Sequence, residues 1–162
     1  MSVILIGMPS CGKSTLGVLL AKRLGMRFID SDLLIQEREG KLLHEIIGEV
    51  GTDGFIAIEN LVNRNITDRN AVISTGGSAV YGKEAMEHLK TLGKVVYLRI
   101  SYSEMEKRLG DYVHRGVVIK KGHTLADMYK ERVALYEKYA DIIVDGTNDI
   151  SNTLDLIAEK IR

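Results

Sequence analysis

An eight-residue pattern near the start of the chain constrains its fold more than any other feature. Residues 7–14 read Gly-Met-Pro-Ser-Cys-Gly-Lys-Ser and match G-x-x-x-x-G-K-S/T at each fixed position. The two glycines allow the backbone to curl so that successive N–H groups converge on phosphate oxygens, aided by the positive end of a following helix. Lys13 would bring a charge to the β- and γ-phosphates, and the Ser14 hydroxyl would bind Mg²⁺. This segment, here called the phosphate loop, therefore predicts a nucleoside triphosphate site.

Around this loop, short β-branched runs alternate with amphipathic stretches of helical length. The alternation is typical of an α/β fold in which a parallel sheet carries helices on both faces. Five strands are predicted, at Val3 to Ile6, Arg27 to Ile29, Ala71 to Ser74, Val95 to Ile100 and Ile142 to Val144. Helices are predicted at Lys13 to Leu24, Asp32 to Glu39, Leu42 to Ile47, Gly54 to Thr67, Lys83 to Thr91, Tyr102 to Leu109, Leu125 to Ala140 and Ile150 to Ile161.

The composition favours one domain that covers residues 1–162. The chain is 45% hydrophobic, which is enough for a core, and no repeat or linker divides it. Lys+Arg and Asp+Glu both number 22, which argues against nucleic acid as the main partner. The apolar run before the phosphate loop is too short for a signal peptide or a membrane span, and a single cysteine, Cys11, is typical of a reducing compartment. We therefore expect a cytoplasmic monomer with no membrane partner.

Two segments outside the phosphate loop predict further parts of the site. Asp30-Ser31-Asp32 closes the second strand, and residues two apart on a strand point to the same side, so both carboxylates can face the phosphate loop. Asp32 could instead cap the helix that follows. The segment Gly110 to His123 is rich in glycine and basic residues and predicts a mobile, positively charged loop.

Beyond these motifs the chain resembles the shikimate kinase family over essentially its whole length. From Asp32 to Phe55 the resemblance runs almost position by position, and Thr75-Gly76-Gly77 extends it after the third strand. The residues that carry the first stretch are Ile35, Gly40, Leu43, Ile46, Ile47, Gly51 and Phe55, and Arg132-Val133-Ala134-Leu135-Tyr136 carries it near the end. The resemblance implies a three-layer P-loop kinase fold with a five-stranded parallel sheet and a lid loop. It also implies ATP-dependent phosphoryl transfer to a hydroxyl of a small metabolite.

The resemblance further implies roles for individual residues. Asp30 would hold Mg²⁺ through water, Asp32 would orient the acceptor hydroxyl and take its proton, and Arg132 would bind the acceptor carboxylate. Arg115 would close over the transferring phosphoryl group from the lid. The catalytic residues are thus Lys13, Asp32 and Arg115, the metal ligands Ser14 and Asp30, and the ATP-binding residues Gly7, Cys11, Gly12, Lys13, Ser14 and Thr15. The acceptor would be bound by Asp32, Glu59, Gly76, Gly77, Ser78 and Arg132.

Three positions depart from the family pattern, all on the acceptor side or in the lid. The arginine of the family motif Phe-Arg-x-x-Glu is Ile56 here, and an aliphatic side chain cannot make its paired hydrogen bonds to a carboxylate. The third glycine of the family's Gly-Gly-Gly turn is Ser78. The lid reads Arg115-Gly116-Val117-Val118 and lacks the family's proline. These changes leave the ATP side intact and affect which acceptor the site would bind.

Three functions are compatible with these residues. The first is a kinase of shikimate or a related hydroxylated acid. The second is a P-loop kinase of another acceptor, such as gluconate or a nucleoside monophosphate, although no arginine-rich insertion is present to clamp a nucleotide. The third is a non-catalytic nucleotide sensor whose lid is read by a partner. The joint presence of Lys13, Ser14, Asp30 and Asp32 argues against the sensor, because a sensor has no need of a base.

Overall fold

Five parallel strands form the centre of the molecule. The computed structural model describes residues 1–110 and 116–162. The strands are β1 (Ser2–Gly7), β2 (Arg27–Asp30), β3 (Ala71–Ser74), β4 (Gly93–Arg99) and β5 (Ile142–Asp145). They lie in the order β2-β3-β1-β4-β5, and each neighbouring pair is parallel. The predicted five-stranded parallel sheet is therefore confirmed, with strand ends shifted by at most two residues.

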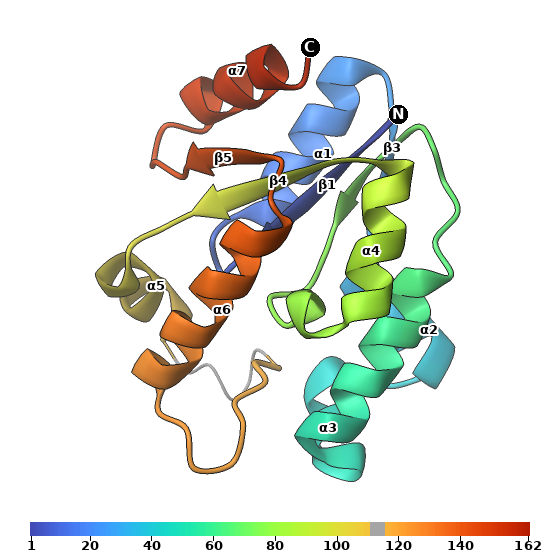
Figure 1. Cartoon of the computed structure of the whole chain (residues 1–162), viewed down its shortest axis with the longest axis vertical. Coiled ribbons are helices and arrows are strands. Elements are labelled where there is room, and N and C mark those ends of the chain that lie inside the picture. Colours follow the sequence, from blue (N-terminus) through green and yellow to red (C-terminus); the bar gives the residue numbers. More distant parts are fainter. Residues whose placement is uncertain (111–115) are drawn as a thin grey trace.

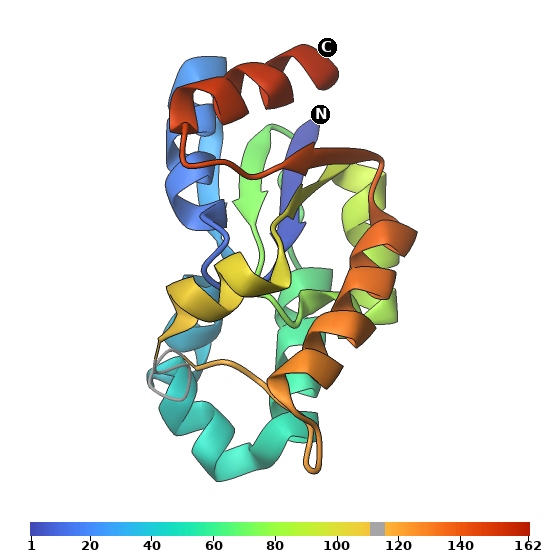
Figure 2. The same cartoon turned by 90° about the vertical axis from the view of Figure 1, so that its left-hand side faces the viewer.

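Helices cover both faces of this sheet. They are α1 (Lys13–Leu24), α2 (Ser31–Glu39), α3 (Leu43–Arg64), α4 (Lys83–Leu92), α5 (Tyr102–Leu109), α6 (Leu125–Tyr139) and α7 (Ile150–Lys160), with a short 3₁₀ turn η1 (Ala79–Tyr81) that was not predicted. Figures 1 and 2 show α1 and α7 on one face and α4 and α6 on the other. In the described parts of the chain, no helix is both long and apolar enough to cross a membrane.

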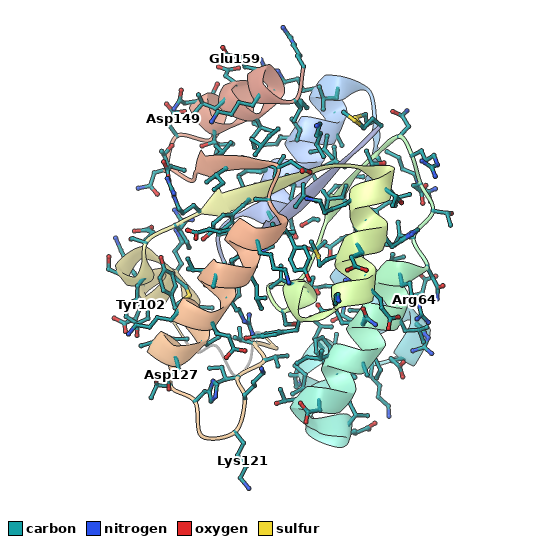
Figure 3. All side chains as sticks on the ribbon, viewed as in Figure 1. Arg64, Tyr102, Lys121, Asp127, Asp149 and Glu159 are labelled. Atoms are coloured by element: carbon teal, nitrogen blue, oxygen red, sulfur yellow. The ribbon has the colours of Figure 1, made fainter. Side chains whose placement is uncertain are left out.

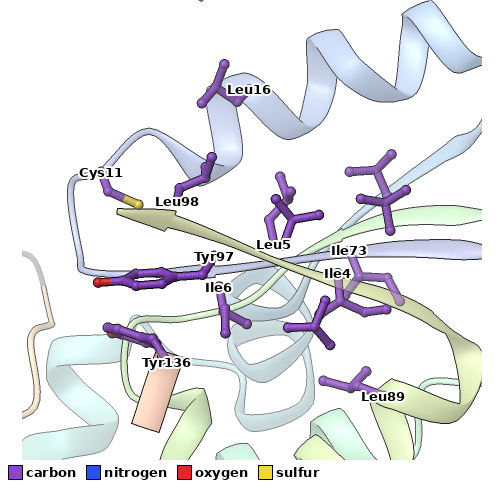
Figure 4. Close-up of a cluster of buried hydrophobic side chains, with 14 of the residues drawn as sticks. Ile4, Leu5, Ile6, Cys11, Leu16, Ile73, Leu89, Tyr97, Leu98 and Tyr136 are labelled. Carbon is purple, nitrogen blue, oxygen red and sulfur yellow. The ribbon is translucent and has the colours of Figure 1, made fainter. Parts of the chain in front are cut away.

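The core lies on both sides of β1, whose six residues are all buried. Alternate side chains of a strand point to opposite faces, so β1 supplies apolar groups to both layers. Leu5 points to the side of the sheet where Leu16 of α1 lies, while Ile6 points to the opposite side, where Tyr136 of α6 and Leu89 of α4 lie (Figure 4). Charged side chains such as Arg64, Asp149 and Glu159 lie on the outer surface (Figure 3). The apolar run that precedes the phosphate loop is thus fixed at the centre of the molecule.

The region predicted as two helices, Leu42 to Ile47 and Gly54 to Thr67, is α3, which consists of two helical segments joined at a sharp kink. Gly51 has φ 73° and ψ −179° inside it, and helical geometry resumes on both sides. Only glycine adopts this backbone conformation readily. The predicted break between two helices is therefore confirmed, although it occupies a single residue and the helices extend closer to it than predicted.

The strand order brings the ends of β1, β2 and β3 together. In parallel sheets the carboxyl ends share one edge, and ligands bind where successive connections leave the sheet in opposite directions. Here β1 lies between β3 and β4, so the phosphate loop that follows β1 lies beside the segment that follows β3. Asp30 ends β2 at the same edge.

Candidate active site

The phosphate loop wraps around the amino end of α1. Gly7 and Gly12 have φ 153° and φ 98°, and the loop is closed by a hydrogen bond from Cys11 N to Met8 O at 3.2 Å. A side chain on Gly7 would begin 2.6 Å from the carbonyl oxygen of Leu98, so the neighbouring strand excludes any other residue there. The loop thus has the conformation in which its amide groups can converge on an anion.

Lys13 lies folded against this loop. Its side chain is 7% exposed, and Nζ donates to Gly7 O and Met8 O, both at 2.8 Å. Cys11 Sγ is 3.5 Å from the same nitrogen, and the Cys11 side chain is otherwise part of the apolar core (Figure 4). Cys11 is therefore a small, buried residue of the loop, with its side chain packed into the core.

Asp30 and Asp32 take different places from those that strand geometry predicted. Asp30 is the N-cap of α2: its Oδ1 accepts from Asp32 N at 3.0 Å, and its Oδ2 accepts from Ser14 Oγ at 3.0 Å. Asp32 lies in the first turn of the helix and not on the strand, and the alternative that it is the cap is wrong. The expectation that both carboxylates face the phosphate loop is confirmed, because Asp30 accepts from Ser14 and Asp32 lines a cavity with Lys13. Because Asp30 makes the cap, the Asp32 side chain is left to line the cavity described below.

The Asp32 carboxyl is more basic than an ordinary aspartate. Burial raises its pKa to about 6, the neighbouring charge of Asp30 adds to this increase, and the positive charge of Lys13 opposes it. A carboxylate with a raised pKa accepts a proton more readily than a solvated one does. This property, together with its position, is what a base in the cavity requires.

Glu59 and Ser78 form a buried pair on the opposite wall. Glu59 is 2% exposed, and its Oε1 accepts from Ser78 Oγ at 2.6 Å. A side chain on Gly76 would begin 2.6 Å from Glu59 Oε2 and 2.7 Å from Asp32 Oδ1. Both carboxyl groups therefore face the same small space above Gly76, which exists only because that residue is glycine.

Arg132 reaches the site from α6. It is 1% exposed, Nη2 donates to Val118 O, and the guanidinium carbon is 5.4 Å from the centre of the Tyr81 ring. A side chain on Gly77 would begin 3.0 Å from Nη1, and Gly77 O accepts a hydrogen bond from the Tyr136 hydroxyl. The guanidinium is therefore held in place by neighbours that leave part of it facing Gly77.

These residues surround a cavity of about 240 Å³ at the carboxyl edge of the sheet. The predicted site residues that line it are Gly12, Lys13, Ser14, Thr15, Asp32, Glu59, Gly76, Gly77, Ser78 and Arg132. Gly7, Cys11 and Asp30 do not line it and lie in the loop or the cap behind it. Ile56 also lies elsewhere, against the apolar cluster that contains Ile35 and Phe55. Arg115 lies outside the described residues.

The described part of the predicted lid is residues 116–123, and its first three residues form one side of the cavity. Val118 is buried and lines the cavity with Gly116 and Val117, and Lys120 pairs with Glu131 at 2.7 Å. The mobility of the segment stays a prediction.

Sequence reasoning missed a second hollow beside the phosphate loop. It has a volume of about 230 Å³ and is lined by Cys11, Gly12, Thr15, Leu16, Arg108, Thr147, Asn148 and Ile150. Arg108, in the last turn of α5, donates to Asn148 Oδ1 at 3.2 Å and approaches Ser10 O at 3.5 Å. No motif marks Arg108, and a basic residue at a helix end is ordinarily a solvated charge, so only the fold shows that it borders the loop.

The donors near Ser14 suit a small, hard cation. The Ser14 hydroxyl and the Asp30 carboxylate are oxygen ligands in direct contact, and Mg²⁺ prefers oxygen and keeps several waters and substrate phosphates. No cluster of three or more His, Cys, Asp or Glu that could hold a metal occurs among residues 1–110 and 116–162. The arrangement therefore fits a cation that arrives with phosphate and does not fit a cage made wholly of protein ligands.

Comparisons with known proteins agree with this geometry. The family model described as shikimate kinase matches residues 9–162. A shikimate kinase of Clostridium botulinum (strain 657 / Type Ba4) is 38% identical over 164 residues, which cover 96% of this chain and 94% of that protein. The crystal structure of shikimate kinase from Aquifex aeolicus vf5 has a TM-score of 0.84 at 31% identity, covering 98% of this chain and 95% of that chain. Shikimate kinase from Acinetobacter baumannii, solved in complex with shikimate, has a TM-score of 0.85 at 30% identity. The match covers 98% of this chain and 93% of that chain.

Proposed function

The chain belongs to the shikimate kinase family, and from that premise we propose that it transfers the terminal phosphoryl group of ATP to a hydroxyl of shikimate or a closely related hydroxylated acid. One observation carries the proposal: Lys13, Asp32 and Arg132 line the same cavity of about 240 Å³. Such a reaction needs three groups: a cation that binds the phosphates, a base that takes the hydroxyl proton, and a cation that binds the acceptor carboxylate. They come from three different elements, α1, α2 and α6.

The phosphate loop and the hollow beside Arg108 together fit ATP. The loop amides and Lys13 would bind the phosphates, and the hollow would take the adenine against the planar guanidinium of Arg108. Ser14 would hold Mg²⁺ directly and Asp30 through water. The metal would neutralise negative charge on the phosphates.

The other end of the cavity fits the acceptor. Arg132 would bind the acceptor carboxylate, which positions a hydroxyl near Asp32. The hydroxyl oxygen bonds to the γ-phosphorus as the bond from that phosphorus to ADP breaks, and Asp32 takes the hydroxyl proton. Gly76 and Gly77 would let the acceptor lie against the backbone. Arg115 would stabilise the transferring group from the lid.

A coupled assay of ADP release tests this function. The protein is supplied with ATP and Mg²⁺ and offered shikimate, quinate, gluconate and simple hydroxy acids in turn. We expect shikimate or one related acid to be turned over far faster than water. Preference for gluconate would favour the second function, and hydrolysis at the rate of water with every acceptor would favour a nucleotide sensor.

Asp32→Asn tests the base. The variant keeps the size of the side chain but cannot take a proton, so kcat should fall by about 10²-fold to 10⁴-fold. ATP binding should remain, measured by titration with a fluorescent nucleotide, because the phosphate loop is unchanged. Ser31→Ala, at the adjacent buried residue of the same helical turn, is the matched control and should retain most of the turnover. Full activity of Asp32→Asn would remove Asp32 from the mechanism.

A further inference from the structure

The carboxyl group of Glu59 has only one hydrogen-bond donor in the described structure. Ser78 Oγ donates to Oε1, whereas Oε2 is buried and has no partner among residues 1–110 and 116–162. Oε2 is on the side of Gly76, where the cavity lies. An ionised carboxylate with a single neutral donor, at 2% exposure, would lose far more hydration than it regains. The surroundings therefore favour the protonated acid.

The charges that face Glu59 from neighbouring elements do not change this conclusion. Asp32 approaches it from α2, Arg132 from α6 and Lys13 from the phosphate loop. Lys13 donates to the loop carbonyls and Arg132 donates to Val118 O through Nη2, and no hydrogen bond from either cation reaches Glu59 in the described structure. Burial raises the pKa of Glu59 to about 8; the Ser78 hydrogen bond opposes the increase, Asp32 adds to it, and Arg132 and Lys13 oppose it.

The position of the proton follows from the hydrogen bond. Because Ser78 Oγ donates to Oε1, that oxygen acts as the acceptor, and the proton of the neutral acid belongs on Oε2. Oε2–H then has no protein acceptor and is directed to the space that the substrate enters. A buried donor without a partner is costly, so a ligand oxygen that meets it gains affinity.

We propose that Glu59 is a neutral acid in the resting protein and that its Oε2–H donates a hydrogen bond to the acceptor carboxylate beside Arg132, with Ser78 as the residue that positions it. The inference rests on the proposed function and deepens it, because it defines the acceptor side of the site. An ionised Glu59 would repel the substrate anion, whereas the neutral form binds it. Ile56 packs into an apolar cluster and supplies no second cation, so a neutral donor takes over part of that task.

The test is the pH dependence of the acceptor KM at saturating ATP and Mg²⁺. Acceptor affinity requires the protonated acid, so KM should rise about tenfold between about pH 7 and about pH 9. Glu59→Gln has a donor that does not titrate, so its KM should be flat over this range. Ser78→Ala removes a contact that favours the ionised form, so the rise should move to higher pH. Glu49→Gln, at an exposed position of the same helix, is the control and should follow the unaltered protein.

Infrared difference spectroscopy distinguishes failure of the Glu59 proposal from failure of the proposed function. A neutral Glu59 gives a carboxylic acid carbonyl band near neutral pH that is absent in Glu59→Gln, whichever acceptor is used. Absence of that band overturns the proposal even if turnover is normal. A flat KM profile in the unaltered protein also overturns it. If the band is present but no acceptor binds or is phosphorylated, the proposed function fails, and the donor role fails with it.

Discussion

Lys13 has its charge buried at the centre of the phosphate loop. Nζ donates to two carbonyl oxygens of that loop and to Cys11 Sγ, and these hydrogen bonds hold it inside the curve of the loop. A cation in a largely dehydrated position interacts more strongly with developing charge than one on the surface does. In the proposed function, Lys13 therefore acts on the transferring group.

Lys13→Met should abolish most of the phosphoryl transfer. The change removes the charge but keeps a long apolar stem, so kcat should fall by about 10²-fold or more while circular dichroism stays unchanged. Lys22→Met, at an exposed position of the same helix, is the matched control and should leave kcat within about twofold. Equal losses in the two variants would contradict a specific role for Lys13.

Glu59 also makes folding stability depend on pH. Its pKa rises from 4.5 in the unfolded chain to about 8 in the folded one, so the folded protein keeps a proton that the unfolded chain has lost. The resulting stability is complete below pH 4.5 and is lost as pH rises toward about 8.

Glu59→Gln should therefore gain stability relative to the unaltered protein as pH increases. The difference should grow by at most about 1.4 kcal/mol per pH unit between about pH 5 and about pH 8 and then level off. Urea unfolding of both proteins across this range measures it. Parallel stability curves would show that Glu59 is ionised in the folded protein.

At the scale of elements, the kink in α3 serves two parts of the site. Before Gly51, Leu43 lines the cavity near Gly116 of the predicted lid; after it, Phe55 and Glu59 line the cavity wall. A straight helix could not present both segments to one cavity. The sequence signal for this bend is a glycine in an amphipathic run, which predicts a break but not its angle.

Gly51→Ala should destabilise the protein by about 1–3 kcal/mol, because a side chain at this φ and ψ is strained even though no neighbouring atom would meet it. Gly48→Ala is the matched control. It lies in helical conformation in the same element, also with open space around it, and should be stabilising by about 0.5–1 kcal/mol. Equal effects in thermal unfolding would contradict the strain argument.

At the scale of the whole molecule, the large exposed apolar side chains are spread over several elements. Within the described residues they are Met1, Val18, Leu19, Leu33, Leu42, Val50 and Ile150. A stable dimer needs a contiguous apolar core at its interface. We therefore expect a monomer of 18.0 kDa in sedimentation equilibrium, with and without ATP. A concentration-dependent species of twice that mass would contradict it.

Much of the fold could be predicted because its signals are local. The strand runs, the phosphate loop and α1 depend on residues close in sequence, and α1 and α5 have the predicted bounds. The resemblance to a family extended this to Asp32, Glu59 and Arg132, which do line one cavity. A break was predicted between Ile47 and Gly54, but the geometry of the kink at Gly51 and the hollow at Arg108 were not, because each depends on a backbone conformation or a neighbour that no local pattern records.

The sequence by itself determined the alternation of strands and helices and the phosphate-binding turn, since periodicity and glycine placement act over a few residues. Only the tertiary structure decided that Asp30 meets Ser14 while Asp32 faces the cavity, and that Ser78 meets Glu59. Residues 59, 78 and 132 are far apart in the chain. The charge state of Glu59 depends on how much water the packed helices exclude, and exclusion of water is a property of the assembled molecule.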